Sequence, residues 1–569
     1  MNKMPDDKTS VADGYLSLLS ANGVDYFFGN AGTDFAPIVE AFAKAAATGA
    51  KAPKPVIVPH EAVAVAMAHG YYQISGRAQA VMVHVQVGTA NAICNIINAA
   101  DQKVPILMTA GRNPIHESGP AGARNRVIHW AQEMYDQAGM LRMHVKWDYE
   151  LRTALQLRTV VDRAFQMAMS EPRGPVYMSL PREVIAGPLG SAPDHAPSRL
   201  RPAPASSPNP GEIEHAAALI AASENPLIVT ADVGRYPASV AALEAFATRF
   251  AIPVVQHHPR FHNIDFNHPM YFGAMPGELL KQADLVIAAE CDVPWLPSLE
   301  QPQDGAKVLH LALDPVFGRE PIRSFPADAL LTGTAEHALP QLAAALDRKV
   351  DAGRIDARRA RLAERQSVFR KEIDAKLEKA KTRRPIDPGY ATRLIAEKCG
   401  QDAIYVAESA FEPDHARLSR PGSFFRLTAA GGLGWALGAA LGTKLAAPER
   451  LVVACVGDGA YIFNNPLAAH YVSQAENLPI LMVIFNNGGW ESVRRANRSM
   501  YPDGLAVNAN RQPLSDFTVD SAFEKVVEAN GGFGLRVDDP VELAAAIDKA
   551  LHAVRVEKRQ ALLNVIVGA

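Results

Sequence analysis

The stretch VVACVGDG (residues 452–459), followed one helix length later by LMVIFNNGGW (residues 481–490), decides the expected fold. Each apolar run predicts a buried strand, and each strand ends on small polar residues. Strands that alternate with helices in this way indicate a parallel α/β sheet, in which ligands bind at the carboxyl ends of the strands. The two strand ends are therefore the first candidate site.

The residues at these strand ends have the chemistry of a magnesium and phosphate site. Asp458 offers a carboxylate oxygen, Asn487 an amide oxygen and Gly489 a backbone carbonyl, and magnesium prefers such ligands. Gly457 and Gly459 let the backbone approach a phosphate, and a helix that begins there points free N–H groups at it. The simpler interpretation is that Asp-Gly and Asn-Gly only make turns. The presence of both motifs after apolar strands favours the metal site.

The composition is that of a globular protein with several domains. The chain has 569 residues, too many for one core, with 48% hydrophobic and 21% charged residues. Its net charge of -3 argues against a nucleic-acid binder, and it has no evident signal segment or membrane-spanning apolar run. We therefore expect a cytoplasmic protein without nucleic-acid or membrane partners. Core packing is the expected role of the scattered cysteines, Cys94, Cys291, Cys399 and Cys455.

The order of predicted strands and helices divides the chain into three α/β units. We expect doubly wound parallel-sheet domains over residues 1–186, 213–347 and 387–569. A linker rich in Pro, Ser and Ala (187–212) and a polar, helix-forming linker (348–386) separate them. Acidic and basic residues are interspersed in the second linker, which indicates a solvated helix.

The sequence resembles the thiamine diphosphate-dependent enzymes of the acetolactate synthase, pyruvate oxidase and benzoylformate decarboxylase family. The family signature, GDG and later NN, stands here at residues 457–459 and 486–487. TAAGGLGWALGAALGTKLAAPE (428–449) resembles the family's diphosphate-binding domain, and GVDYFFGNAGTDF (23–35) and HEAVAVAMAHGYYQISG (60–76) resemble its pyrimidine-binding domain. The three predicted units then correspond to pyrimidine-binding, middle and diphosphate-binding domains.

The resemblance implies thiamine diphosphate and Mg²⁺ as cofactors. A buried glutamate of the family holds N1′ of the cofactor so that its 4′-imino group can deprotonate C2, and Glu61 matches it; alone, Glu61 would be an N-terminal helix charge. Leu433 matches the aliphatic side chain that bends the cofactor. No flavin-binding pattern is present, so FAD is not expected. The implied cofactor-binding residues are Glu61, Gly431, Gly432, Leu433, Gly457, Asp458, Gly459, Ala460, Asn487, Gly489 and Trp490, with Asp458, Asn487 and Gly489 as metal ligands.

The same resemblance predicts residues that act on the substrate. His84 matches a histidine that assists proton transfer in benzoylformate decarboxylase, which suits an imidazole; a lone histidine in an apolar strand is otherwise structural. By strand alternation Gln86 faces the same way as His84. Thr33 stands where that decarboxylase has a serine. Glu491 is an acid or base, or only a helix N-terminal carboxylate.

Further implications concern assembly and departures from the family. Family members place the glutamate and the metal site on different subunits, which implies at least a homodimer and predicts a homotetramer. The second histidine of the decarboxylase has no counterpart here, because Pro294 and Trp295 stand in its place. This gap weakens the assignment as a simple decarboxylase.

We therefore expect a carbon–carbon lyase or ligase that acts on a 2-oxo acid, by decarboxylation, acyloin-type condensation or both, through an enamine. The alternative is a 2-hydroxyacyl-CoA lyase that gives formyl-CoA and a carbonyl product. Arg494, Arg495 and Arg498 could then receive an anionic substrate or a coenzyme A phosphate, or be solvated. A non-catalytic cofactor-binding scaffold is disfavoured by the retained Glu61 and Asp458, and an unrelated nucleotide-binding protein by the lack of a P-loop.

Overall fold

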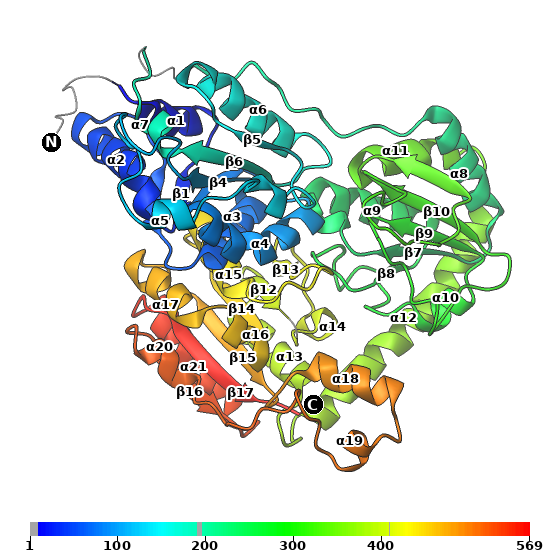
Figure 1. The fold of residues 1–569 in the computed structure, drawn as a ribbon. Helices are drawn as coiled ribbons and strands as arrows, with labels where there is room; N and C mark the ends of the chain where they lie inside the picture. The colour runs from blue at the N-terminus through cyan, green and yellow to red at the C-terminus, as the bar shows by residue number, and fades with distance from the viewer. Residues whose placement is uncertain (1–8, 191–195, 409, 569) are drawn as a thin grey trace.

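The computed structural model describes residues 9–190, 196–408 and 410–568. Three α/β domains are present, each built on its own parallel sheet, which confirms the predicted fold class (Figure 1). The first domain (blue to cyan in Figure 1) lies next to the third (yellow to red), and the second (green) lies beside them.

The first domain has a six-stranded sheet in the order β2-β1-β3-β4-β6-β5. Its strands are β1 (Tyr26–Gly29), β2 (Lys54–Ile57), β3 (Gln79–Val83), β4 (Ile106–Arg112), β5 (Asp148–Glu150) and β6 (Val176–Pro181). Its helices are α1 (Val11–Ala21), η1 (Thr33–Phe35), α2 (Ala36–Thr48), α3 (Glu61–Ser75), α4 (Val85–Asp101), α5 (Ile128–Ala131), η2 (Ala138–Met140), η3 (Ala154–Gln156), α6 (Leu157–Met169) and α7 (Arg182–Ala186).

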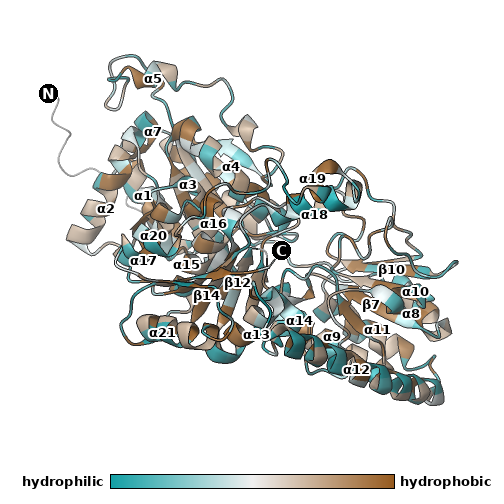
Figure 2. Ribbon diagram, turned by 90° about the horizontal axis from the view of Figure 1, so that it is seen from below, coloured by the Kyte–Doolittle hydropathy of each residue, from teal (hydrophilic) through white to brown (hydrophobic). Residues whose placement is uncertain are grey.

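The second domain has a five-stranded sheet in the order β11-β10-β9-β7-β8. Its strands are β7 (Pro226–Thr230), β8 (Val254–Gln256), β9 (Leu285–Ala289), β10 (Lys307–Ala312) and β11 (Ala329–Thr332). Its helices are α8 (Pro210–Ala222), η4 (Val233–Arg235), α9 (Pro237–Phe250), α10 (Gly277–Lys281) and α11 (Ala335–Leu346). The long helix α12 (Ala352–Ala380), which is largely hydrophilic in Figure 2, then leads to the third domain.

The third domain repeats the strand order of the first, as β13-β12-β14-β15-β17-β16. Its strands are β12 (Ile404–Glu408), β13 (Phe424–Arg426), β14 (Val452–Gly457), β15 (Leu481–Asn486), β16 (Phe533–Val537) and β17 (Ala561–Ile566). Its helices are α13 (Pro388–Cys399), α14 (Pro413–Ala416), α15 (Ala436–Ala446), α16 (Asp458–Phe463), α17 (Pro466–Ala475), α18 (Glu491–Met500), α19 (Leu505–Asn508), α20 (Glu524–Glu528) and α21 (Leu543–Arg555).

Helices α3 and α15 join the first and third domains. The two backbones come so close that a Cβ atom on Gly70 would lie 1.9 Å from the Ala439 carbonyl oxygen, and one on Gly442 would lie 1.9 Å from the Met67 carbonyl oxygen. Side chains of both helices belong to one hydrophobic core that extends through the two domains. Alanine and glycine along both helices therefore fix how the two domains meet.

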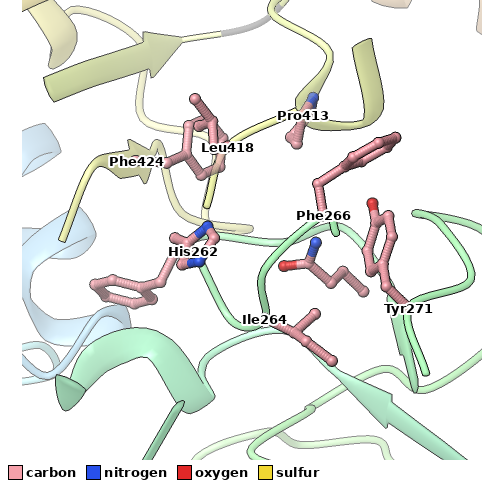
Figure 3. A pocket seen from close by; sticks show the side chains of 9 residues that line it. His262, Ile264, Phe266, Tyr271, Pro413, Leu418 and Phe424 are labelled. Atoms are coloured by element: carbon pink, nitrogen blue, oxygen red, sulfur yellow. The ribbon is translucent and has the colours of Figure 1, made fainter. Parts of the chain in front are cut away.

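The second and third domains meet through a mixed polar and aromatic junction. The Tyr271 hydroxyl donates to Asp414, whose other carboxylate oxygen accepts from the Ala274 N–H at 3.0 Å. Figure 3 shows the cavity that these loops enclose, with Phe266 and Leu418 in its wall. Its volume is about 10 Å³, enough for at most one water molecule, so it is not a substrate site.

Two features of the fold bear on the sequence predictions. Cys291, Cys399 and Cys455 are buried as expected, but Cys94 on helix α4 is exposed, and its thiol lies 3.7 Å from the Leu433 carbonyl oxygen of the third domain. Core packing is therefore the wrong explanation for Cys94. Among residues 9–190, 196–408 and 410–568, none of the helices combines the length and the apolar character that a membrane span requires.

Candidate active site

The predicted metal residues come together where β14 and β15 end side by side. Gly457 pairs with Phe485 in the parallel ladder, so the residues after both strands emerge at one edge of the sheet. Asp458, the first residue of α16, is 2% exposed, and its carboxylate accepts hydrogen bonds from Gly489 N–H at 2.9 Å and Gly459 N–H at 3.0 Å. The carboxylate thus ties the two strand ends together. Burial raises the pKa of Asp458 above its usual value.

The donor set at this edge fits Mg²⁺. The side-chain oxygen Oδ1 of Asn487 is buried and has no hydrogen-bond partner, a costly arrangement unless a ligand engages it. With the Asp458 carboxylate and the Gly489 carbonyl it would offer three hard oxygen ligands, and Mg²⁺ takes the rest from water and phosphate. No cluster of three or more His, Cys, Asp or Glu residues suited to a metal occurs in the described part of the chain. A site with one carboxylate and one amide is therefore the metal candidate.

Gly459 and Trp490 shape the wall of this site. A Cβ atom on Gly459 would lie 2.2 Å from the Trp490 ring, so any side chain there would displace the indole. The indole is held edge-on between Phe463, 5.7 Å away by ring centroids, and Phe517, 5.2 Å away. The glycine that the sequence assigns to phosphate approach therefore also makes room for the tryptophan.

Arg494 has a role that the sequence did not reveal. Its guanidinium donates to Asp516 Oδ1 at 2.6 Å and to the backbone carbonyls of Asn487 and Gly488 at 3.0 and 2.9 Å. The arginine thereby holds the backbone of residues 487–489, the loop that carries two of the candidate ligands. It is neither solvated nor free to bind a substrate anion, which corrects both alternatives suggested by the sequence; its partner Asp516 lies in a later loop.

Glu491 is engaged within helix α18. It is the first residue of the helix, and its Oε1 accepts from the Arg498 guanidinium at 2.5 Å. Arg495 lies 3.6 Å from the same oxygen and is itself largely exposed. The structure thus shows the helix N-terminal carboxylate that the sequence allowed, and an acid or base role for Glu491 stays a prediction.

The loop that carries Leu433 is held by a buried carboxylate. Glu408, the last residue of β12, accepts backbone hydrogen bonds from Gly434 at 2.6 Å, Trp435 at 2.9 Å and Ala436 at 2.7 Å. Asn464 Nδ2 donates to the same carboxylate at 3.0 Å and connects it to helix α16. Glu408 was not singled out from the sequence, although it has the same signal as Asp458, a charged residue at the end of an apolar run.

The first domain contacts the same loop through helix α4. Asn98 donates to the Gly432 carbonyl at 2.7 Å and accepts from the Gly432 N–H at 3.1 Å, and Asn95 donates to the Gly434 carbonyl at 3.2 Å. The loop has two residues with positive φ, Gly431 (67°) and Gly434 (93°), which other residues adopt only with strain. Its conformation is therefore set from both domains.

Glu61 lies at the carboxyl edge of the first sheet. It is the first residue of α3, just after β2, and is 6% exposed. Asn91 Nδ2 donates to its Oε2 at 3.2 Å, and a Cβ atom on Gly88 would lie 3.2 Å from its Oε1. A side chain at residue 88 would therefore crowd the Glu61 carboxyl group, which favours a glycine at that position.

His84 is paired with a residue that the sequence did not single out. Its Nδ1 lies 2.5 Å from Oδ1 of Asp34, and its Nε2 lies 3.2 Å from Nε2 of Gln132. The Asp34 hydrogen bond raises the pKa of His84, with Glu61 contributing in the same direction. Thr33 is half-buried and directly precedes Asp34 in η1. Asp34 in η1 and Gln132 after α5 are both distant in sequence from His84, so no local pattern around His84 could have identified them.

The reasoning about Gln86 was wrong. Strand β3 ends at Val83, His84 caps the next helix, and Val85 has a φ of 32°. Gln86 therefore lies in helix α4, and strand alternation does not place it on the face of His84.

The predicted residues thus form two groups. Thr33, Glu61 and His84 follow β1, β2 and β3 at the carboxyl edge of the first sheet, while Asp458 and Asn487 follow β14 and β15 at the same edge of the third. The candidate proton-handling groups lie on one domain and the candidate metal ligands on another. Such a division suits a cofactor with a heterocycle at one end and a diphosphate at the other.

Comparison with known proteins gives the class directly. Models of thiamine pyrophosphate enzymes match at residues 9–140 (N-terminal TPP binding domain), 213–342 (central domain) and 410–565 (C-terminal TPP binding domain). The chain belongs to the thiamine pyrophosphate enzyme family. Its relatives in that family include a group of decarboxylases and acetolactate synthases.

Relatives in this group match over most of their length. Benzoylformate decarboxylase of Pseudomonas aeruginosa is 27% identical over 495 residues, which cover 84% of this chain and 86% of that protein. Acetolactate synthase of Mycobacterium bovis is 24% identical over 586 residues, 98% of this chain and 88% of that protein. The structure of the thiamine diphosphate-dependent 4-hydroxybenzoylformate decarboxylase of Rhodococcus jostii aligns with a TM-score of 0.76 at 22% identity, over 98% of this chain and 99% of that one.

Proposed function

We propose that this enzyme decarboxylates a 2-oxo acid in a reaction that depends on thiamine diphosphate and Mg²⁺. The product leaves as an aldehyde or is joined to a second carbonyl compound. The observation that carries the proposal is the placement of Glu61 and His84 after the two strands that flank β1, where the charge of Glu61 acts on the His84 ring. A cofactor-activating carboxyl group and a proton donor are then present at one edge.

The residues of both groups have defined tasks in this proposal. Asp458, Asn487 and the Gly489 carbonyl would hold Mg²⁺ against the diphosphate, Glu61 would hold a proton toward the pyrimidine ring, and Leu433 would fix the cofactor's shape. When bound, thiamine diphosphate supplies a carbon nucleophile and an electron sink that permits carbon dioxide to leave. His84 would keep a proton on Nε2 for delivery to the substrate-derived carbon.

The choice of substrate class rests on the named relatives and on the arginines. Benzoylformate, named in one relative, is an aromatic 2-oxo acid. A 2-hydroxyacyl-CoA substrate would need cations for its phosphates, but Arg494 and Arg498 are paired with Asp516 and Glu491, and only Arg495 of the three is largely exposed. We therefore favour the 2-oxo acid and leave its side chain to experiment.

The deciding test is turnover by the protein reconstituted with thiamine diphosphate and Mg²⁺. Aliphatic and aromatic 2-oxo acids and 2-hydroxyacyl-CoAs are supplied, and carbon dioxide, aldehyde and formyl-CoA are measured. We expect carbon dioxide from at least one 2-oxo acid and a rate at least about a hundredfold lower for Glu61→Ala, because the lost carboxyl group activates the cofactor. Formyl-CoA without any carbon dioxide would contradict the proposal.

We further propose a homodimer as the minimal active assembly, with a homotetramer expected. Support comes from exposed apolar side chains in two stretches of sequence, residues 115–143 of the first domain and residues 493–514 of the third. In the first domain these are Ile115, Val127, Trp130, Tyr135 and Met143, and in the third Val493, Met500, Leu505 and Leu514. Exposed patches of this kind mark protein interfaces. Sedimentation of the reconstituted protein as a monomer at the concentration where it turns over would refute this.

A further inference from the structure

His84 and Asp34 form a closely enclosed pair. Asp34 is 4% exposed, and while its Oδ1 contacts His84 Nδ1, its Oδ2 accepts from the Val85 N–H at 3.3 Å. Two glycines close the space around the pair. A Cβ atom on Gly111 would lie 1.8 Å from Asp34 Oδ2, and one on Gly32 would lie 2.1 Å from His84 Nδ1. The Asp34 carboxylate and the His84 imidazole therefore fit together in only one orientation relative to each other.

This arrangement determines which ring nitrogen is available for proton transfer. A carboxylate is only an acceptor, so Nδ1 of His84 must carry a hydrogen in both the neutral and the charged ring. The proton that His84 exchanges is then the one on Nε2. That nitrogen lies 3.2 Å from Nε2 of Gln132.

Gln132 is arranged to accommodate either state of that nitrogen. In the structure, the Gln132 side-chain amide N–H donates to Nε2 of a neutral His84, while Gln132 Oε1 is buried without a partner. Rotation of the amide by half a turn would bring Oε1 to His84 and let it accept from a protonated Nε2. The two orientations have nearly the same shape, so no space has to be created. The unpartnered oxygen is thereby explained by the second state.

We propose that Asp34 and Gln132 are positioning residues for His84, with Asp34 fixing the tautomer and the Gln132 amide rotating with each proton that Nε2 gains or loses. The inference rests on the proposed function, in which His84 delivers this proton. The proton passes from Nε2 to the substrate-derived carbon, and water returns one to the neutral ring. Other charged groups that face the pair are Glu61 from α3, His129 from α5 and Arg182 from α7.

The test follows the His84 imidazole by ¹⁵N NMR as the pH of the reconstituted enzyme is varied. His84→Gln identifies the resonance. Asp34→Asn should lower the proton affinity of His84 about tenfold or more, because the stabilising carboxylate charge is lost. Gln132→Glu should raise the affinity, because a carboxylate can only accept from the protonated ring. A merely structural role would not give shifts of opposite sign.

Two comparisons make the outcome decisive. Asp162→Asn, which alters a buried aspartate paired with Arg158 on α6, controls for folding effects and should leave the His84 titration unchanged. The alkaline limb of the pH–rate profile should move with the NMR midpoint in Asp34→Asn and Gln132→Glu. Unchanged midpoints, or midpoints that shift without moving the rate profile, would overturn the inference. Shifted midpoints with no turnover of any 2-oxo acid would instead refute the proposed function.

Discussion

At the residue scale, the proposed metal site can be tested at the amide of Asn487. Replacement by leucine keeps the volume and removes the unpartnered oxygen, so we expect thiamine diphosphate to bind at least about tenfold more weakly in the presence of Mg²⁺. Calorimetric titration with and without Mg²⁺ measures the effect, and the exposed Asn508→Ala is the matched control. Equal affinities for Asn487→Leu and the parent protein would show that Asn487 is not a ligand.

The residues that sequence reasoning found and missed differ in how their partners are reached. Asp458 and Asn487 could be predicted because each closes an apolar strand, and parallel strands end at a common edge. Asp34 could not, because its significance arises only when the fold brings His84 against it. Arg494 was misjudged for the same reason, since its acceptors are backbone carbonyls and Asp516. Local sequence patterns reveal residues at strand ends that face a site, but not the distant residues that position them through hydrogen bonds.

At the scale of elements, strand β12, the loop before α15 and helix α16 are joined by the Glu408 carboxylate. In Glu408→Gln an NH₂ group replaces one carboxylate oxygen and cannot accept from the backbone N–H groups. We therefore expect roughly 2–3 kcal/mol lower unfolding free energy. Hydrogen exchange should be faster at residues 434–436 in particular. Glu412→Gln, at a half-exposed glutamate paired with His415, is the control. Unaltered exchange at these amides would contradict the bracing role.

Element boundaries explain the error at Gln86. An apolar run such as that before His84 predicts a strand well but does not show where the strand stops, and here the helix starts at Val85. The positive φ of Val85 marks this sharp transition, which no residue preference announces, because valine rarely adopts it. Extending the strand by three residues, from Val83 to Gln86, was enough to place Gln86 on the wrong face.

At the scale of the whole molecule, the first and third domains have one strand order without evident sequence repetition. His84 and Asp458 each follow the third strand of their domain, and α3 and α15 are corresponding helices. The same framework thus presents the proposed proton-handling residues in one copy and the proposed metal ligands in the other. The sequence predicted three α/β units from apolar periodicity, but the packing of α3 on α15 depends on close backbone contacts that become visible only in three dimensions.

All three domains contain a buried neutral histidine, which makes the whole molecule sensitive to acid. Burial lowers the pKa to about 4 for His69 in the first domain, His262 and His310 in the second and His470 in the third. Between pH 6.5 and 4 these histidines bind protons in the unfolded chain but stay neutral in the folded chain, so stability is lost as the pH falls through this window. Each histidine should cost roughly 2 kcal/mol at pH 5.

We therefore expect the thermal midpoint of the unliganded protein to fall steadily from pH 7 to pH 5. His470, which accepts from the Tyr461 hydroxyl at 2.8 Å and lies 2.7 Å from Gln560 Oε1, offers the sharpest check. His470→Gln cannot titrate, so the variant should be less stable than the parent at pH 7 but should lose less stability on acidification. The exposed His552→Gln should follow the parent at every pH. Parallel curves for the parent and His470→Gln would mean that proton uptake by the buried histidines does not limit acid stability, and that the acid response arises from carboxylates.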